Sequence, residues 1–290
     1  MSGSGGQNRL GQGIEAMQGA ALDPPQRERR SPWRFAWWVV FIAGSLYFFL
    51  PLLATFAFSL RDRPFGSAYT KIVVDSQFFT TLGYSFVVGF ITIILSIAIM
   101  VPTAFWVRLR IPRARPIVEF ITLLPFVVPP IVLVFGLIRT YSHPPLPFTH
   151  TSIGSTALLV CGYVVLSFPY MYRAVDTGLR SMDVQSLTEA AQSLGAGWLR
   201  VLVQVILPNL RVALLSGAFL TLAIVVGEFT IALFLARPVF AVYLSRLGDQ
   251  APYQQSAVAL ISFGLTWIAM GLISVIGRGG RGRVTMAGTR

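Results

Sequence analysis

Residues 78–107 read FFTTLGYSFVVGFITIILSIAIMVPTAFWV, and none of these 30 side chains is charged. An α-helix of that length extends about 45 Å at 1.5 Å per residue, whereas the hydrocarbon core of a bilayer is about 30 Å thick. The stretch therefore predicts a transmembrane helix that tilts in the bilayer or continues beyond it.

Five more apolar stretches of roughly 20 to 26 residues follow the same pattern, and stretches of that length span a bilayer. Hydrophobic residues make up 54% of the 290-residue chain and charged residues 12%, against about 25% charged residues in soluble domains. This composition excludes a soluble enzyme, a nucleic-acid-binding module and a disordered protein. We expect an all-α integral membrane protein in contact with lipid, with six transmembrane helices at residues 35–60, 78–107, 117–138, 153–172, 212–236 and 255–276.

The third stretch contains three prolines, Pro125, Pro129 and Pro130. Each proline removes an amide donor and crowds the preceding turn, so an unbroken helix cannot hold all three. We expect a kinked or broken span, and such backbone persists at membrane depth only where protein or a water-lined cavity covers it. Pro129 and Pro130 are therefore candidates for a pathway or gate; the alternative is a plain packing kink.

The 23 basic residues are distributed unequally between the two sides of the predicted membrane domain. Seventeen lie on the side of the chain ends and six on the other side. Because basic residues gather in cytoplasmic connections, both termini are predicted to be cytoplasmic, and the net charge of +12 needs no nucleic-acid partner. Residues 1–34 are a polar tail that we expect to be disordered, and residues 278–290 form a second cytoplasmic tail.

The connection at residues 173–211 is the longest between two predicted spans. Asp183 can cap a helix that begins at Val184, and Gly195 can end that helix in a left-handed conformation. Four residues at helical spacing predict one apolar face: Val184, Leu187, Ala191 and Leu194. A second apolar pattern starts at Trp198, and we expect Pro208 to end it. The connection is thus predicted to form a helix, a glycine turn and a second helix next to the membrane.

Glu189-Ala190-Ala191 is followed by Gly195 after three residues, and Leu207-Pro208 comes twelve residues later. This spacing resembles the EAA loop of the permease subunits of bacterial binding-protein-dependent ABC importers, with Val205 at the position where the family has Ile. The resemblance of layout covers residues 70–277, which we take as the permease domain. It implies the type I importer permease fold, a bacterial inner-membrane location, and a coupling helix that docks on an ATPase.

The resemblance also implies which molecules work with this chain. Two ATPase subunits would bind ATP and Mg²⁺, a second permease subunit, the same or related, would complete the pathway, and a solute-binding protein would deliver the solute. Six residues would form the ATPase-coupling site: Glu189, Ala190, Ala191, Gly195, Leu207 and Pro208. Trp198 or its apolar neighbours would fasten the loop to the helices, and a solvated carboxylate is the alternative interpretation of Glu189.

Catalytic motifs are missing from the sequence. It contains no HExxH zinc motif, no GxSxG elbow and no GxxxxGK[ST] phosphate loop. We therefore expect no catalytic residue, metal site or cofactor in this chain, and no enzymatic activity of its own. A secondary transporter would need ionisable residues in several spans, and only Glu228 is clearly embedded.

Glu228 lies deep in the fifth predicted span, between Gly227 and Phe229. A carboxylate at such depth costs about 2.5–3.5 kcal/mol on insertion scales, so it should face a cavity or a partner. Glu228 and Phe229 could line the pathway and attract a cation, or Glu228 could link neighbouring helices. The Gly-Glu-Phe stretch and the general pattern of spans resemble those of permeases in the polyamine, iron(III), thiamine and phosphonate group of importers. A polyamine or other cation is therefore the first expected solute, with phosphonate or iron(III) as alternatives.

Overall fold

The computed structural model describes residues 33–278, and the predicted tails lie almost entirely outside this range. The described chain is helical and contains no strand. It divides into two compact units, Met1–Leu53 and Ala54–Arg290. Helix α2, Trp33–Ser59, covers the first predicted span and passes from the first unit into the second.

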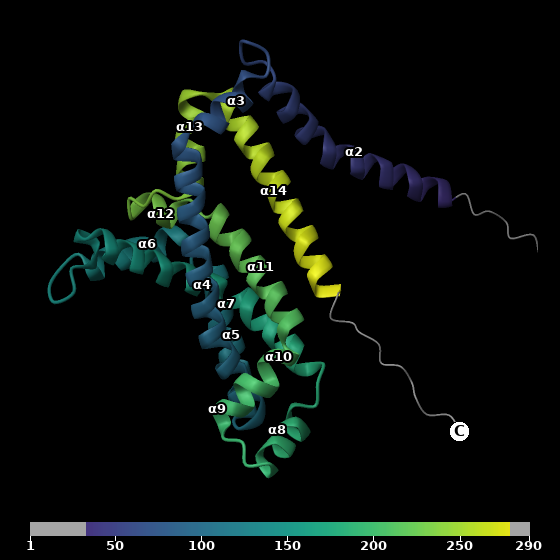
Figure 1. Ribbon diagram of the computed structural model, residues 1–290, viewed down its shortest axis with the longest axis vertical. Helices are drawn as coiled ribbons and strands as arrows, with labels where there is room; N and C mark the ends of the chain where they lie inside the picture. The colour runs from purple at the N-terminus through teal and green to yellow at the C-terminus, as the bar shows by residue number, and fades with distance from the viewer. Residues whose placement is uncertain (1–32, 279–290) are drawn as a thin grey trace, which may run out of the picture. The chain divides into compact units, whose positions relative to one another are not determined.

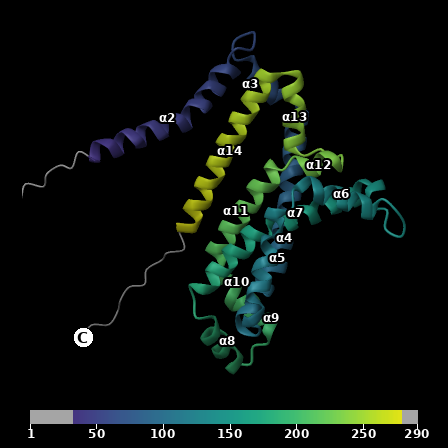
Figure 2. The ribbon, with the colours of Figure 1, turned by 180° about the vertical axis from the view of Figure 1, so that it is seen from behind.

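Three helices form the centre of the second unit: α4 (Ser76–Leu109), α7 (Ser152–Arg180) and α11 (Arg211–Gly227). They pack against one another along their lengths, as both ribbon views show (Figures 1 and 2). A Cβ atom at Gly178 of α7 would lie 2.7 Å from Ala213 Cβ of α11, so only glycine permits this approach. The hydroxyls of Ser96 and Ser167 join α4 to α7 at 2.6 Å. Small residues and interhelical hydrogen bonds are the usual means of association in lipid.

The third predicted span is broken, as the prolines indicated. Helix α5 runs from Arg115 to Val127, after a short 3₁₀ helix at Pro112–Ala114, and α6 runs from Pro130 to Tyr141. The two pieces meet at an angle of 96°. Pro129 N-caps α6 with an extended backbone, and its carbonyl accepts hydrogen bonds from Val132 and Leu133. The polar groups at the break are thus partly satisfied by the start of the next helix.

The fifth predicted span, 212–236, is not the continuous helix that we expected. Helix α11 ends at Gly227, and the short helix α12, Thr230–Phe234, follows after Glu228 and Phe229. The break arises because Glu228 adopts an extended backbone conformation and its side chain caps the new helix. Apolar composition alone carried no signal for this break.

The end of the second unit away from the loop helix α8 (Val184–Ser193) is built from α3 (Ser67–Val74), α13 (Phe240–Gln250) and the start of α14 (Pro252–Arg278). Their apolar side chains form one buried cluster with Phe78 of α4. The Tyr243 hydroxyl donates to the Asp75 carboxylate at 2.7 Å, and Asp75 also caps α4 by accepting from the Gln77 amide. Burial and this hydrogen bond raise the pKa of Tyr243.

The number of membrane crossings is only partly fixed by these helices. Three described segments are long and apolar enough to cross a bilayer: Trp37–Ser59, Ser76–Leu109 and Ser152–Arg180. The count reaches five if each of two bent helix pairs is one span, namely α5 with α6 and Trp198–Asn209 with α11. Helix α14 holds the sixth predicted span, and the count of six stays a prediction.

Candidate functional site

The predicted loop helix is present as α8, Val184–Ser193. The Asp183 carboxylate caps it by accepting from the Ser186 amide at 3.1 Å and from the Ser186 hydroxyl at 2.6 Å. Because the hydroxyl and then the amide stabilise the charged form, the pKa of Asp183 lies below its usual value. The cap fixes where the helix begins, four residues after the last residue of α7.

The helix ends in a turn that needs glycine. Gly195 has φ +82°, and its amide donates to the Gln192 carbonyl at 2.9 Å. The Ala196 amide donates to the Ala191 carbonyl at 3.0 Å, which completes a Schellman motif. A side chain at this position would meet no neighbouring atom, so the requirement is one of backbone conformation alone.

The two faces of α8 differ sharply in exposure. Val184 and Thr188 are each 3% exposed and face the membrane helices, and Ala191 is half-buried. Glu189 and Ala190 are exposed, and the Glu189 carboxylate accepts only from the Gln185 amide side chain, at 2.9 Å, among the described hydrogen bonds. Ala190 therefore presents a small side chain to the outside, where another molecule can approach closely.

Leu194 does not share the face of Val184, although the helical spacing predicted it, since Leu194 is 88% exposed and Val184 is 3% exposed. The reason is that α8 stops at Ser193, so Leu194 is the C-cap residue and no longer follows the helical spacing. Leu199 is also exposed, at 75%. The loop thus carries two large apolar side chains, Leu194 and Leu199, on its free surface.

Trp198 fastens this loop to the end of α4. Its ring packs edge-on against Phe105, with 6.1 Å between ring centroids, and lies tilted by 36° against Trp106, with 6.0 Å between ring centroids. The Arg110 guanidinium lies 4.7 Å from the Trp198 ring centroid, a cation–π contact. Loop residues Val184, Val201 and Ile206 belong to one buried cluster with α4 and α7. The inner face of the loop is therefore continuous with the core.

The second loop helix is irregular. It begins as α9 (Trp198–Arg200), continues as a π-helix at Val201–Ile206 and ends as α10 (Leu207–Asn209). Pro208 has no amide to donate, so regular α-helical pairing four residues back is impossible there. The helix ends one residue beyond Pro208, not at it, and the chain then bends by 78° into α11. Leu207 packs on the core cluster, whereas Pro208 is exposed.

The residue Glu228 is 8% exposed, and its carboxylate accepts hydrogen bonds from backbone amides. One oxygen accepts from the amides of Thr230 at 2.8 Å and Ile231 at 3.0 Å, and the other also accepts from Ile231. The Tyr163 hydroxyl donates to the Glu228 carbonyl at 3.4 Å. Both carboxylate oxygens are therefore used to start α12, and this geometry favours the structural interpretation of Glu228.

The helices that follow the two breaks meet each other. Phe135 of α6 and Phe234 of α12 have ring centroids 4.9 Å apart, and the ribbon shows α6 and α12 side by side (Figure 1). Gly162 of α7 lets α12 approach closely, because a Cβ atom at this position would lie 3.3 Å from the Ile231 side chain. Pro129 is exposed and Pro130 is half-buried at the start of α6. The proline break and the Glu228 break thus build one compact unit within the fold.

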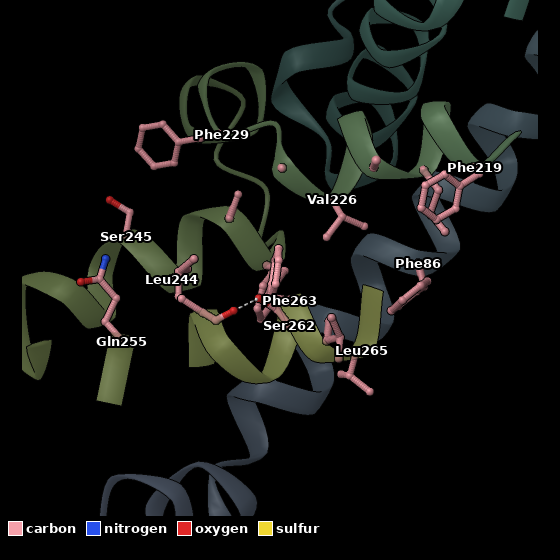
Figure 3. A pocket seen from close by; sticks show the side chains of 17 residues that line it. Phe86, Phe219, Val226, Phe229, Leu244, Ser245, Gln255, Ser262, Phe263 and Leu265 are labelled. Atoms are coloured by element: carbon pink, nitrogen blue, oxygen red, sulfur yellow. Dashed lines mark hydrogen bonds between the residues drawn. The ribbon is translucent and has the colours of Figure 1, made fainter. Parts of the chain in front are cut away.

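Phe229 borders a cavity of about 620 Å³ formed by α4, α11, α13 and α14. Figure 3 shows its ring on one side of the cavity, with Phe86 and Phe219 on the other. The lining is mainly apolar, and sequence reasoning missed its polar members, Ser245, Gln255 and Ser262. They come from α13 and α14, which lie next to α4 only in the folded chain.

Comparison with known proteins identifies the family. Residues 100–279 match the model of the binding-protein-dependent transport system inner membrane component. A probable molybdenum ABC transporter permease of Haloferax volcanii is 28% identical over 80% of this chain and 86% of its own length. The spermidine/putrescine permease PotB of Escherichia coli K12 is 24% identical over 67% of this chain and 78% of its own length. Further relatives are named as molybdenum or sulfate transport permeases.

The fold agrees with this result. A crystal structure of a bacterial ABC transporter that imports alginate matches with a TM-score of 0.68 at 14% identity, over 94% of this chain and 99% of that chain. The resemblance seen in the EAA spacing is therefore confirmed at the level of the family and the fold. The chain belongs to the binding-protein-dependent transport system inner membrane components and is a permease subunit of an ABC importer, not its ATPase.

Proposed function

We propose that this subunit passes a small oxyanion of the molybdate or sulfate class, delivered by a solute-binding protein. The names of most of its relatives support an oxyanion. The argument for a cation depended on a free carboxylate at Glu228, and that carboxylate is occupied by backbone amides. A polyamine is the second candidate, because PotB aligns over two thirds of this chain.

One observation supports the coupling site: the inner face of the loop is packed against the helices, and its outer face exposes apolar side chains among polar ones. Trp198 and Val184 hold the inner face, while Ala190, Leu194 and Leu199 remain exposed. Exposed apolar side chains on a small rigid element suit a protein partner. The partner is the ATPase, one copy for each permease, where ATP and Mg²⁺ bind. Glu189 and Gly195 shape this surface, and Leu207 and Pro208 join it to α11.

A second permease subunit, the same or related, completes the pathway. Both termini and the loop lie in the cytoplasm of a bacterial inner-membrane system; the unequal distribution of basic residues supports this orientation. The gate of this half is the unit formed by α6 and α12. Its backbone is broken at Pro129-Pro130 and at Glu228-Phe229, and irregular backbone at membrane depth is found where it borders protein or a cavity.

Replacing Gly195 by Val tests the coupling site. The left-handed backbone at φ +82° is strained for a β-branched residue, so the turn should distort and the exposed surface should lose its shape. The assembled transporter should lose most ATP hydrolysis that depends on the loaded solute-binding protein. Gly197→Val is the matched control, since Gly197 has φ −72° and open space around it. Equal stimulation in both variants would refute the coupling role of Gly195.

Leu194→Asp separates docking from folding. Leu194 is 88% exposed, so a charge there should leave the permease stable while it weakens co-purification of the ATPase. Unchanged ATPase recovery would exclude Leu194 from the docking surface.

Glu228→Gln and Glu228→Ala separate the two interpretations of this carboxylate. Gln keeps one acceptor for the Thr230 and Ile231 amides, so uptake should stay near the parent rate. Ala removes the cap and should destabilise the protein by about 1–2 kcal/mol, measured as a lower midpoint of thermal unfolding. A Gln variant that is stable but slow in uptake would instead make Glu228 a pathway residue.

Uptake by proteoliposomes that contain the complete transporter tests the substrate class. With the cognate solute-binding protein, radiolabelled molybdate or sulfate should accumulate in an ATP-dependent manner, and labelled spermidine should not. Accumulation of spermidine alone would overturn the oxyanion proposal.

A further inference from the structure

A second cavity of about 790 Å³ lies among α5, α7 and α11. It lies where α7 leads into the connection at residues 173–211, which we call the coupling loop. Its polar lining includes Glu119, Arg173, Asp176, Arg180, Asn209 and Ser216. Further hydroxyl groups come from Tyr172, Thr177 and Ser181, and the apolar lining includes Leu123, Phe126 and Leu220. The four charged residues of the lining lie near the start of α5 and near the end of α7, next to the loop. No sequence motif pointed to this cavity.

Four charged residues form one ion-pair network, and three of them, Glu119, Asp176 and Arg180, line the cavity. Arg115 Nε lies 2.9 Å from Glu119 Oε1, and an Arg115 terminal nitrogen lies 3.4 Å from Asp176 Oδ2. An Arg180 terminal nitrogen lies 2.6 Å from the same Asp176 oxygen and 3.8 Å from Glu119. Two guanidinium groups thus share two carboxylates, and the network as a whole is neutral.

Arg173 stands apart from this network. It lines the same cavity, its residue is exposed, and within residues 33–278 it forms no ion pair with a carboxylate. Because Glu119 and Asp176 are paired with Arg115 and Arg180, Arg173 is the one charged residue of the lining that no described carboxylate pairs with. Two hydroxyl groups are also available to a ligand, because Thr177 and Ser216 line the cavity, are exposed and make no described side-chain hydrogen bond.

We propose that this cavity is an oxyanion-binding site, with Arg173 as the residue that holds the anion. A guanidinium presents planar N–H donors that match two oxygens of a tetrahedral oxyanion, and hydroxyl groups can donate to the others. A cation is disfavoured, because both carboxylates of the lining are committed to arginine. The site lies at the coupling-loop end of the helices, so it would hold the solute as it leaves the pathway. This inference rests on the proposed function for the identity of the solute.

Anion binding to the complete transporter, in the absence of its solute-binding protein, tests the site directly. The purified complex in nanodiscs is titrated with [³⁵S]sulfate and, separately, with [⁹⁹Mo]molybdate at low ionic strength. Arg173→Gln should weaken binding by about tenfold or more, because a hydrogen bond to a charged group contributes about 1.5–3 kcal/mol. Arg173→Lys keeps the charge but not the planar fork, so its loss should be smaller. Arg113→Gln is the matched control, an exposed arginine near α5 that does not line the cavity.

The outcomes distinguish this inference from the proposed function. Binding that is equal in the parent and in Arg173→Gln, or absent from both, overturns the site. Weaker binding in Arg173→Gln, with the parent affinity retained in Arg113→Gln, supports it. Uptake of oxyanion that is normal in every variant would leave the proposed function standing while it refutes a role for Arg173. Sulfate binding through Arg173 in a transporter that accumulates only spermidine would support the site and refute the oxyanion as transported solute.

Discussion

The packing of Trp198 between the coupling loop and α4 is the contact on which the account of this subunit depends. The indole ring touches Phe105 and Trp106 and lies beneath the Arg110 guanidinium. Without such a contact, a loop of this length would be free to move independently of the membrane helices. With it, the buried side chains of α4, α7 and the loop form one cluster, so a force applied to α8 is transmitted to the helices.

The second constraint is that backbone N–H and C=O groups at a helix break inside a membrane domain need hydrogen-bond partners. Two spans are interrupted, one by Pro129-Pro130 and one by Glu228, and each interruption starts a short helix. The carboxylate of Glu228 supplies acceptors for amides that would otherwise face an apolar interior. A charged residue that looks functional in the sequence is therefore used to form the irregular structure, and the proposed gate is built from that structure.

Much of this organisation was predictable because it depends on local chemistry. Asp183, Gly195 and the prolines of the third span act on their own neighbours, and the structure has the cap, the turn and the break where these residues predict them. Leu194 was misplaced, because helical spacing does not reveal at which residue a helix stops. The break at Glu228 is also local, since its carboxylate caps Thr230 and Ile231, but the uninterrupted apolar composition of the span concealed it. The Arg173 cavity depends on residues distant in sequence, and no local pattern contains that information.

The central claim is that α8 and α4 move as one body when the ATPase closes. The test is the distance between two spin labels in the complete transporter, one at Ser193 on α8 and one at Ile99 on α4. Both labels are attached to introduced cysteines in a Cys161→Ala background. The account predicts the same distance distribution before and after ATP is added, and a broader distribution when Trp198 is replaced by Ala. A distance that shifts on addition of ATP in the parent protein would show that the loop moves separately from the helices and would contradict the account.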